Sequence, residues 1–422
     1  MSTRIINGKK CELKGGRLYI DGAWKFMKTG KPLRDYGNKG QIEELISHLP
    51  ILAKKGFTNL ALNCYWHHFD FVGDGSISAD IEPLRRLIDA INENGMFASL
   101  SVETYGVGGG TLPAGFWKAH PNAVAVDSNG EKASDTEYAY ASVVPSLYDE
   151  DYLRCSRNFI RNISKALADK DFLYCETTVE PQYMGSRNLD YSPAAKKAYG
   201  AWCEKNCKFA PKFPESFPIS DEFIDDVVWN VFRAHWLAGW VNGDARAYRE
   251  GFGGKPVWIA SDYLDAGEKT MRARMGSPMN FLLNLSEPDI LQVNWTWHFD
   301  DRHPNSKAYA RVREVMNATG RDWVVTEHMT INGTDYFPHE MEALLRNTIE
   351  NSTNFGWEFV DVAIDNVDPS QEGVVVAGSF KPLNFSVYNN DWSPKPSMAI
   401  VDANWEKWMA EIAAKQARNP EK

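Results

Sequence analysis

The hydrophobic pattern of the chain alternates between two periods, and this alternation limits the folds that it can form. Short apolar runs with the length of buried strands lie at residues 57–64, 96–102, 172–175, 256–260, 290–293, 323–326 and 356–360. Segments with apolar residues at helical spacing lie between or after them, at about 42–52, 81–91, 153–167, 220–250, 305–318, 338–352 and 397–416. Strands that alternate with helices predict a parallel sheet.

Residues 18–26 supply one more candidate strand and bring the predicted number of strands to eight. Eight strand–helix units in a chain of 422 residues predict an α/β fold, the (β/α)8 TIM barrel. A doubly wound open sheet is the competing fold. It is disfavoured because no Gly-x-Gly-x-x-Gly motif follows the first strand, and the glycine-rich residues 106–110 follow the third strand without leading into a helix.

No repeat, linker or low-complexity tract divides the sequence, so we expect a single catalytic barrel domain over residues 1–422. Residues 103–147 and 207–218 are predicted to be insertions in the loops of this barrel. Residues 366–422 are predicted to form a small C-terminal extension.

Charge and hydropathy exclude several classes of protein. The chain has 46 basic and 56 acidic residues and a net charge of −10, which argues against a nucleic-acid partner. No apolar run approaches the ~18 residues of a membrane span, and the first residues lack the apolar core of a secretory signal, so we expect a cytoplasmic protein. Aromatic residues make up 13% of the chain and include 15 Trp. Such rings can stack on sugars, although they also fill hydrophobic cores.

The cysteines are scattered, and we expect them to be reduced thiols, as is usual for buried cysteines of cytoplasmic proteins. Cys203 and Cys207 are close enough in sequence to form a bridge or to share a metal ion. No second close pair completes a zinc site, so neither a metal nor a cofactor is expected.

Functional groups of a barrel gather at the C-terminal ends of its strands, and two carboxylates stand out there. Glu180 follows the fourth predicted strand and Glu327 follows the seventh. A glycosidic bond is broken by one acid that protonates the leaving oxygen and one carboxylate at the anomeric carbon, and a separation of ~5 Å makes the second group a nucleophile. Because these strands face one another, Glu180 and Glu327 can flank a single bond. For either Glu taken alone, a salt bridge or a helix cap is the competing explanation.

The other strand ends carry the predicted substrate-binding residues, which have polar groups for sugar hydroxyls or rings for sugar faces. They are Asn63, Trp66, Glu103, Tyr105, Tyr183, Asp262, Asn294, Trp295, Trp297, His328 and Trp357. Trp295 and Trp297 lie on the same face of an extended segment, which favours a sugar platform. Packing in the core or a structural ion pair is the competing explanation for each residue.

Several segments resemble glycoside hydrolases of clan A, and family 42 in particular. Residues 112–130, LPAGFWKAHPNAVAVDSNG, are similar to the family 42 loop after the third strand, and residues 145–152 are similar to the start of its next helix. Residues 173–182 lie where the family has its acid/base, and Val179-Glu180-Pro181 resembles the Asn-Glu-Pro of the clan. The run WVVTE that ends at Glu327 resembles the nucleophile motif of strand seven.

This likeness covers roughly residues 15–410 and implies a retaining β-glycoside hydrolase, similar to a β-galactosidase, that acts on a β-linked oligo- or polysaccharide. It implies Glu180 as general acid/base and Glu327 as nucleophile. Val179 replaces the Asn that usually contacts the sugar 2-OH, so another group is expected there or the substrate differs at that carbon. The zinc cysteine cluster of the family is not reproduced. The likeness is compatible with a homo-oligomer.

Two other functions stay open at this point. A carbohydrate-binding barrel without turnover is one, because of Val179 and the missing cysteine cluster. A metal-dependent barrel isomerase or aldolase that uses His67, Asp70, Glu103 and Asp262 is the other. In each hydrolytic or binding hypothesis the expected partner is a carbohydrate, with no nucleic acid and no membrane.

Overall fold

The computed structural model describes most of the chain. The described residues are 2–32, 34–105, 112–133, 143–183, 189–214, 222–264, 268–295, 306–329, 355–360, 387–389 and 391–418. Among the helices of this part, none is both long enough and apolar enough to cross a membrane.

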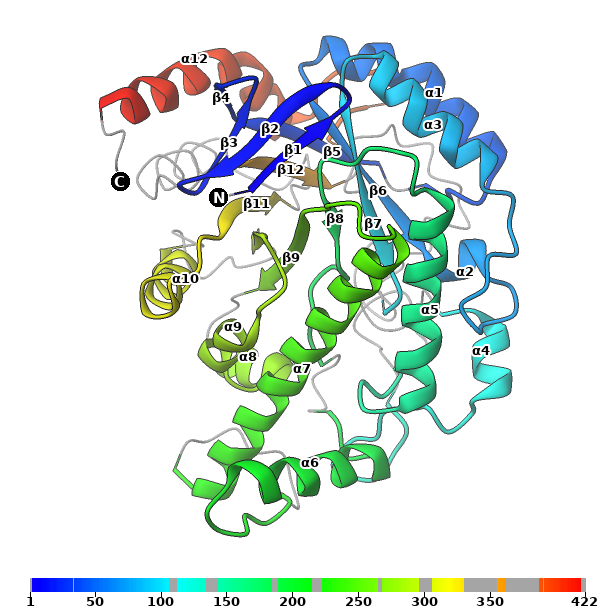
Figure 1. The fold of residues 1–422 in the computed structure, drawn as a ribbon, viewed down its shortest axis with the longest axis vertical. Coiled ribbons are helices and arrows are strands. Elements are labelled where there is room, and N and C mark those ends of the chain that lie inside the picture. The colour runs from blue at the N-terminus through cyan, green and yellow to red at the C-terminus, as the bar shows by residue number, and fades with distance from the viewer. Residues whose placement is uncertain are drawn as a thin grey trace.

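Eight parallel strands form a closed barrel in the order β10-β11-β12-β5-β6-β7-β8-β9 (Figure 1). The strands are β5 (Met27–Lys31), β6 (Asn59–Tyr65), β7 (Phe97–Glu103), β8 (Cys175–Glu176), β9 (Ile259–Leu264), β10 (Ile290–Trp295), β11 (Val324–Met329) and β12 (Gly356–Val360). The predicted TIM barrel is confirmed. Apart from the shortest strand, β8, these strands have five to seven residues each.

Helices surround the barrel. They are α1 (Lys39–Lys54), α2 (Trp66–Phe69), α3 (Glu82–Glu93), α4 (Ala114–Ala119), α5 (Glu150–Ala166), α6 (Pro193–Asn206), α7 (Ile224–Gly251), α8 (Glu268–Met275), α9 (Pro278–Asn284), α10 (Ser306–Thr319) and α12 (Pro396–Arg418). Local sequence explains where several begin. The side chain of Asn38 accepts hydrogen bonds from the first turn of α1, and that of Asp149 accepts one from Tyr152 N–H in α5.

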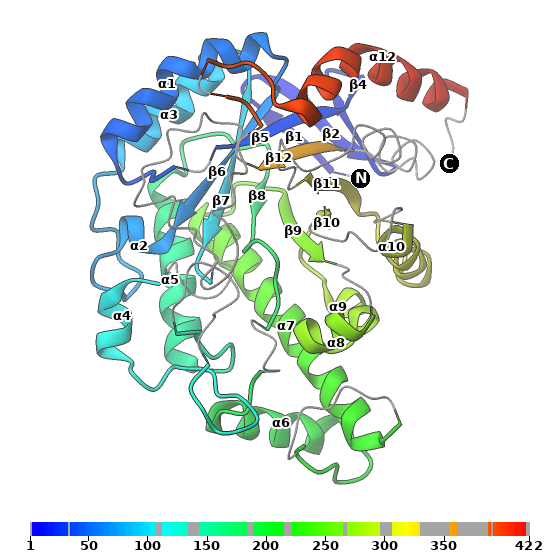
Figure 2. The ribbon, with the colours of Figure 1, turned by 180° about the vertical axis from the view of Figure 1, so that it is seen from behind.

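A separate antiparallel sheet of four strands precedes the barrel. Its strands are β1 (Ser2–Ile6), β2 (Lys9–Lys14), β3 (Arg17–Ile20) and β4 (Ala23–Lys25). Ile6 and Leu18 of this sheet share one apolar cluster with Phe97 and Ile290, which begin barrel strands. The guanidinium of Arg4 also donates to the carbonyl oxygens of residues 172 and 173, each at 3.1 Å. The sheet therefore covers the N-terminal end of the barrel, and Figures 1 and 2 show it at the opposite end of the molecule from α6.

The C-terminal helix α12 packs on the outside of the barrel. The fully buried ring of Trp357, on β12, lies 5.7 Å from the ring of Trp405 and 5.9 Å from that of Trp408, both on α12. The predicted C-terminal extension thus includes a helix that covers β12. Whether residues 1–422 act as one catalytic domain stays a prediction.

Two strand predictions are wrong in detail. Residues 18–26 do not form the first barrel strand, because β3 and β4 pair antiparallel in the N-terminal sheet and β5 takes that place. The fourth strand was expected at 172–175, but β8 begins at Cys175. Both runs contain apolar residues that pack at the N-terminal end of the barrel, under the four-stranded sheet. Apolar composition alone does not distinguish a barrel strand from a segment that covers the end of the barrel. The predicted helix at 338–352 lies outside the described residues.

Replacing Trp357 by Ala should destabilise the protein, because the ring fills the contact between β12 and α12. Loss of a buried ring of this size costs about 3–5 kcal/mol of unfolding free energy. Phe71, which is 65% exposed, offers a matched control, and Phe71→Ala should change stability by less than about 0.5 kcal/mol. Urea denaturation measures both. Equal midpoints for the two variants would contradict the packing described for α12.

Candidate active site

The turn that follows β8 carries Glu180 at the C-terminal mouth of the barrel. Its side chain is 7% exposed, and its carboxylate oxygen Oε2 accepts a hydrogen bond from Gln182 Nε2 at 3.0 Å. The backbone of Glu180 is in the left-handed region, with φ of 48°. A residue other than glycine adopts this conformation at a cost, so the surrounding structure has to hold it.

Two buried carboxylates hold this turn from the strands on either side of β8. Glu103, the last residue of β7, accepts from the hydroxyl of Thr178 at 2.9 Å and from the N–H of Val179 at 2.8 Å. Asp262, on β9, accepts from the N–H of Glu180 at 3.0 Å. Glu103 is 1% exposed and Asp262 0%, so these carboxylates contact the turn and not the open mouth.

A cluster of charges fills the barrel below this turn. Lys31 Nζ lies 2.6 Å from Oε2 of Glu176 and 3.4 Å from Oε1 of Glu358. Glu358 Oε2 also accepts from the hydroxyl of Tyr174 at 2.6 Å and from Gln292 Nε2 at 3.3 Å. Because β6 and β7 separate β5 from β8, Lys31 and Glu176 can meet only inside the barrel.

The pKa values reflect this enclosure. Burial raises the pKa of Glu103 above its ordinary value, and Lys31 and the Val179 N–H act in the opposite direction. Burial by itself would lower the pKa of Lys31. The nearby Glu176 and Glu358, followed by Asp262 and Glu103, outweigh burial and hold the pKa of Lys31 above its ordinary value. Lys31 is therefore the cation that balances these carboxylates.

Four aromatic rings predicted to bind sugar are in the protein interior, and those predictions are corrected. Trp66 is fully buried against Phe116 and Phe159, at the foot of a loop. Tyr105 packs on Trp240 of α7, and Trp357 packs on α12 as described above. Tyr183 donates from its hydroxyl to the carbonyl oxygen of Arg233 at 3.0 Å. These large rings were candidates for stacking on a sugar, but in the structure they pack in the hydrophobic core.

The histidine and aspartate side chains after β6 have structural partners. Asp70 accepts hydrogen bonds from the indole N–H of Trp66 and from the N–H groups of Val72, Gly73 and Gly75, so it organises the loop that follows. Burial, together with His67, lowers the pKa of His68 to about 3. Across the described ranges, no group of three His, Cys, Asp or Glu side chains is arranged to hold a metal ion.

The remaining predicted residues are only partly described. Asn63 lies on β6 and is 4% exposed. Asn294 and Trp295 end β10, and Glu327 and His328 lie on β11, but only their backbone is described. Trp297 lies outside the described residues.

Strand β11 carries Glu327, the predicted nucleophile. Its register pairs Glu327 with Trp357 and His328 with Glu358. Glu358 faces the barrel interior, whereas Trp357 packs on α12. Only the backbone of Glu327 is described, and its pairing does not assign the residue a role. Its role stays a prediction from the sequence.

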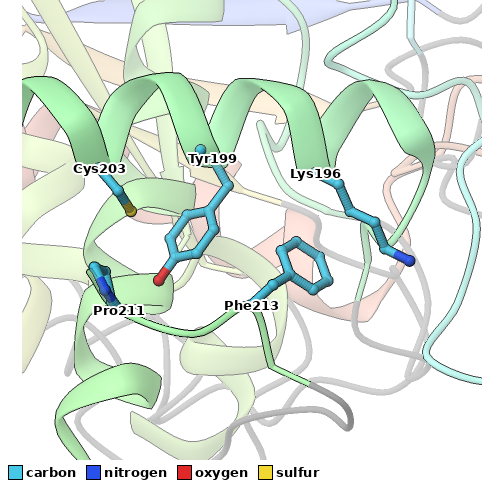
Figure 3. Close-up of a pocket in the computed structure, with 6 residues that line it drawn as sticks. Lys196, Tyr199, Cys203, Pro211 and Phe213 are labelled. Carbon is cyan, nitrogen blue, oxygen red and sulfur yellow. The ribbon is translucent and has the colours of Figure 1, made fainter.

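A pocket of about 350 Å³ beside α6 is separate from these carboxylates (Figure 3). Tyr199, Cys203 and Phe213 line it together with Lys196, Gly200 and Pro211. None of these residues has a carboxyl group, so the pocket lacks the groups for acid–base cleavage of a glycoside. Cys203 and Cys207 beside it are free thiols and form no bridge.

Sequence reasoning missed the inward charge cluster. Lys31 ends the first barrel strand, which had been placed too early in the chain. Glu358 lies between Trp357 and Phe359, and Glu176 follows Cys175, so strand alternation would have assigned both carboxylates to the interior. What only the barrel reveals is that these three residues, from three different strands, meet at one place.

Comparison with known proteins agrees with this geometry. Residues 68–213 match the model of glycoside hydrolase family 42, described as beta-galactosidase. The chain is a glycoside hydrolase, and this matched segment, about a third of its length, is similar to family 42. The match includes the 112–130 loop, the turn of Glu180 and α6, so the predicted resemblance to clan A enzymes is confirmed. No curated protein sequence matches the chain.

Solved structures share the fold of this glycoside hydrolase at low identity. The catalytic domain of a beta-amylase from Paenibacillus polymyxa is 12% identical with a TM-score of 0.62, over 90% of this chain and 97% of that one. Beta-galactosidase from the psychrophilic Marinomonas ef1 is 11% identical with a TM-score of 0.61, over 92% and 60%. Beta-galactosidase from Bacillus circulans sp. alkalophilus is 11% identical with a TM-score of 0.62, over 91% and 56%. The chain thus spans little more than half the length of these two β-galactosidases.

Replacing Lys31 by Met should destabilise the glycoside hydrolase strongly, since Glu176 and Glu358 would stay buried without their cation. Breaking a buried pair in this way costs about 3–5 kcal/mol. The deficit should shrink as pH falls from 8 to 5, because the carboxylates can then take up protons. In the wild type the raised pKa of Lys31 keeps its contribution constant through neutral pH, and only strongly alkaline pH removes it.

Thermal unfolding across this pH range measures the effect. Lys10→Met is the matched control, because Lys10 is an exposed lysine with one surface partner, Glu12. A Lys31→Met deficit that is the same at pH 5 and pH 8 would contradict the proposed charge balance.

Proposed function

We propose that the protein is a retaining β-glycoside hydrolase, similar to a β-galactosidase, that acts on a β-linked oligo- or polysaccharide. The observation that carries this proposal is the position of Glu180. Its carboxyl group lies at the C-terminal mouth of the barrel, on a turn held from both neighbouring strands, within the segment that matches family 42. The β-galactosidases with the same fold support the choice of a β-linked sugar.

In the proposed first step, Glu180 donates its proton to the oxygen of the leaving group while the carboxylate of Glu327 attacks the anomeric carbon. The bond to the leaving group breaks and a covalent glycosyl-enzyme forms on Glu327. In the second step, Glu180 removes a proton from water, which attacks the anomeric carbon and releases Glu327. The sugar leaves with its original β configuration, because the carbon has been inverted twice.

Substrate recognition differs from the clan pattern at one position. Val179, in place of Asn, offers the sugar only its backbone, and its N–H already donates to Glu103. Asn63, on β6, has the same side-chain amide as the Asn that Val179 replaces, and it lies toward the same end of the barrel. We propose that Asn63 contacts a sugar hydroxyl, together with Asn294, Trp295, Trp297 and His328.

Replacing Glu327 by Ala should abolish cleavage of a nitrophenyl β-galactoside, because the covalent intermediate can no longer form. Added azide should restore turnover by attacking the anomeric carbon directly, and the product should be the α-glycosyl azide. NMR of the product identifies the anomer. Full activity of Glu327→Ala on every substrate that the wild type cleaves would remove Glu327 from the mechanism.

Replacing Glu180 by Ala should slow cleavage of a 4-nitrophenyl glycoside by about 10²–10⁴-fold, the usual contribution of a general acid. Cleavage of the 2,4-dinitrophenyl glycoside, whose leaving group needs no proton, should fall far less in its first step. Azide should then yield the β-glycosyl azide by attacking the glycosyl-enzyme. A wild type that binds oligosaccharides but cleaves no member of a broad glycoside panel would instead favour a non-catalytic binding barrel.

A further inference from the structure

The shortness of β8 leaves the backbone beneath Glu180 without strand partners. Cys175 and Glu176 form the whole strand, and the last ladder contact is from the N–H of Thr177 to the carbonyl oxygen of Ala260 at 3.0 Å. Two and three residues further on, the N–H groups of Val179 and Glu180 donate to side chains instead. Buried N–H groups need acceptors, so whatever accepts from these two determines where the turn lies.

Carboxylates from β7 and β9 supply those acceptors, and from this arrangement we propose that Glu103 and Asp262 are positioning residues for the carboxyl group of Glu180. The proposal rests on the acid/base role proposed for Glu180 above. It replaces the sugar contacts predicted for Glu103 and Asp262 from the sequence. Neither residue touches the reacting atoms; both act through the backbone of residues 178–180.

The contacts account for three consecutive residues. Glu103 uses one oxygen for the hydroxyl of Thr178 and the other for the N–H of Val179, and Asp262 uses Oδ2 for the N–H of Glu180. Hydrogen bonds to an ionised acceptor are shorter and stronger than neutral ones. Such contacts can hold Glu180 at its positive φ, a conformation that the residue would otherwise leave.

Charge balance explains how two carboxylates can be buried for this purpose. Both interact with the buried ammonium of Lys31, which also pairs with Glu176 and Glu358. Glu103 and Asp262 are 1% and 0% exposed, and their hydrogen bonds to residues 178–180 favour positioning over sugar binding.

Leaving-group dependence tests the proposal. A misplaced general acid slows substrates whose leaving group needs a proton, whereas loss of a sugar contact slows all glycosides of that sugar alike. For Glu103→Ala and Asp262→Ala we expect kcat/KM to fall about 100-fold for the 4-nitrophenyl glycoside, as a shift of about 1 Å can produce. For the 2,4-dinitrophenyl glycoside of the same sugar the loss should be several-fold smaller.

Conservative variants keep the test decisive if the alanine variants fail to fold. Glu103→Gln retains an acceptor for the Val179 N–H, and the Thr178 hydroxyl can reverse its role, so about threefold loss or less is expected by the same reasoning on placement. Thr178→Val removes only the hydroxyl donor and should show a mild loss that again depends on the leaving group. Asp244→Asn is the matched control, since Asp244 is a buried carboxylate on α7 that is paired with Arg157. It should leave the ratio between the two substrates unchanged.

Equal losses on both substrates for Glu103 and Asp262 variants, with a leaving-group effect for Glu180→Ala, would overturn the positioning role and leave the proposed function intact. Absence of any leaving-group effect in Glu180→Ala would overturn the proposed function itself. An altered substrate ratio in Asp244→Asn would also overturn the positioning role, because removal of any buried charge would then have the same effect.

Discussion

Closing eight strands into a barrel buries their inward side chains, and in this protein the inward side chains at mid-barrel are charged. Lys31 contacts Glu176 from across the barrel and Glu358 from the neighbouring strand β12. Burying a carboxylate without a cation would cost folding free energy, so the ammonium of Lys31 is needed for the carboxylates to be buried there. The apolar cluster under the N-terminal sheet closes one end of the barrel and leaves the opposite end for polar groups.

The site is built upward from this charged layer. Glu103 and Asp262 extend it toward the mouth and accept from the turn that carries Glu180. A strand of two residues makes this possible, because a longer β8 would place those N–H groups in the ladder. In our proposal, the side chains that satisfy this backbone also set the position of the acid, so that folding and catalysis would share one set of hydrogen bonds.

Short apolar runs and helical spacing in the sequence predicted most of the helices and strands. The helices α1, α3, α5, α7 and α10 lie where helical spacing put them, and strands β6, β7 and β12 lie within a few residues of the expected runs. The N-terminal sheet was not anticipated, because the run that forms β3 and β4 was assigned to the first barrel strand. Trp66 and Trp357 were assigned to sugar binding since strand ends and aromatic rings suggested it, and composition cannot tell a stacking platform from a packed core.

The sequence by itself determined the barrel, through the alternation of strand and helix periods, and pointed to Glu180 through its motif and its place after the fourth strand. Only the tertiary structure decided what surrounds Glu180. Lys31, Glu103, Glu176, Asp262 and Glu358 are spread over more than three hundred positions of the chain, and no periodicity links them. They meet because barrel closure brings five strands to one axis, and their contacts depend on distances that sequence spacing does not contain.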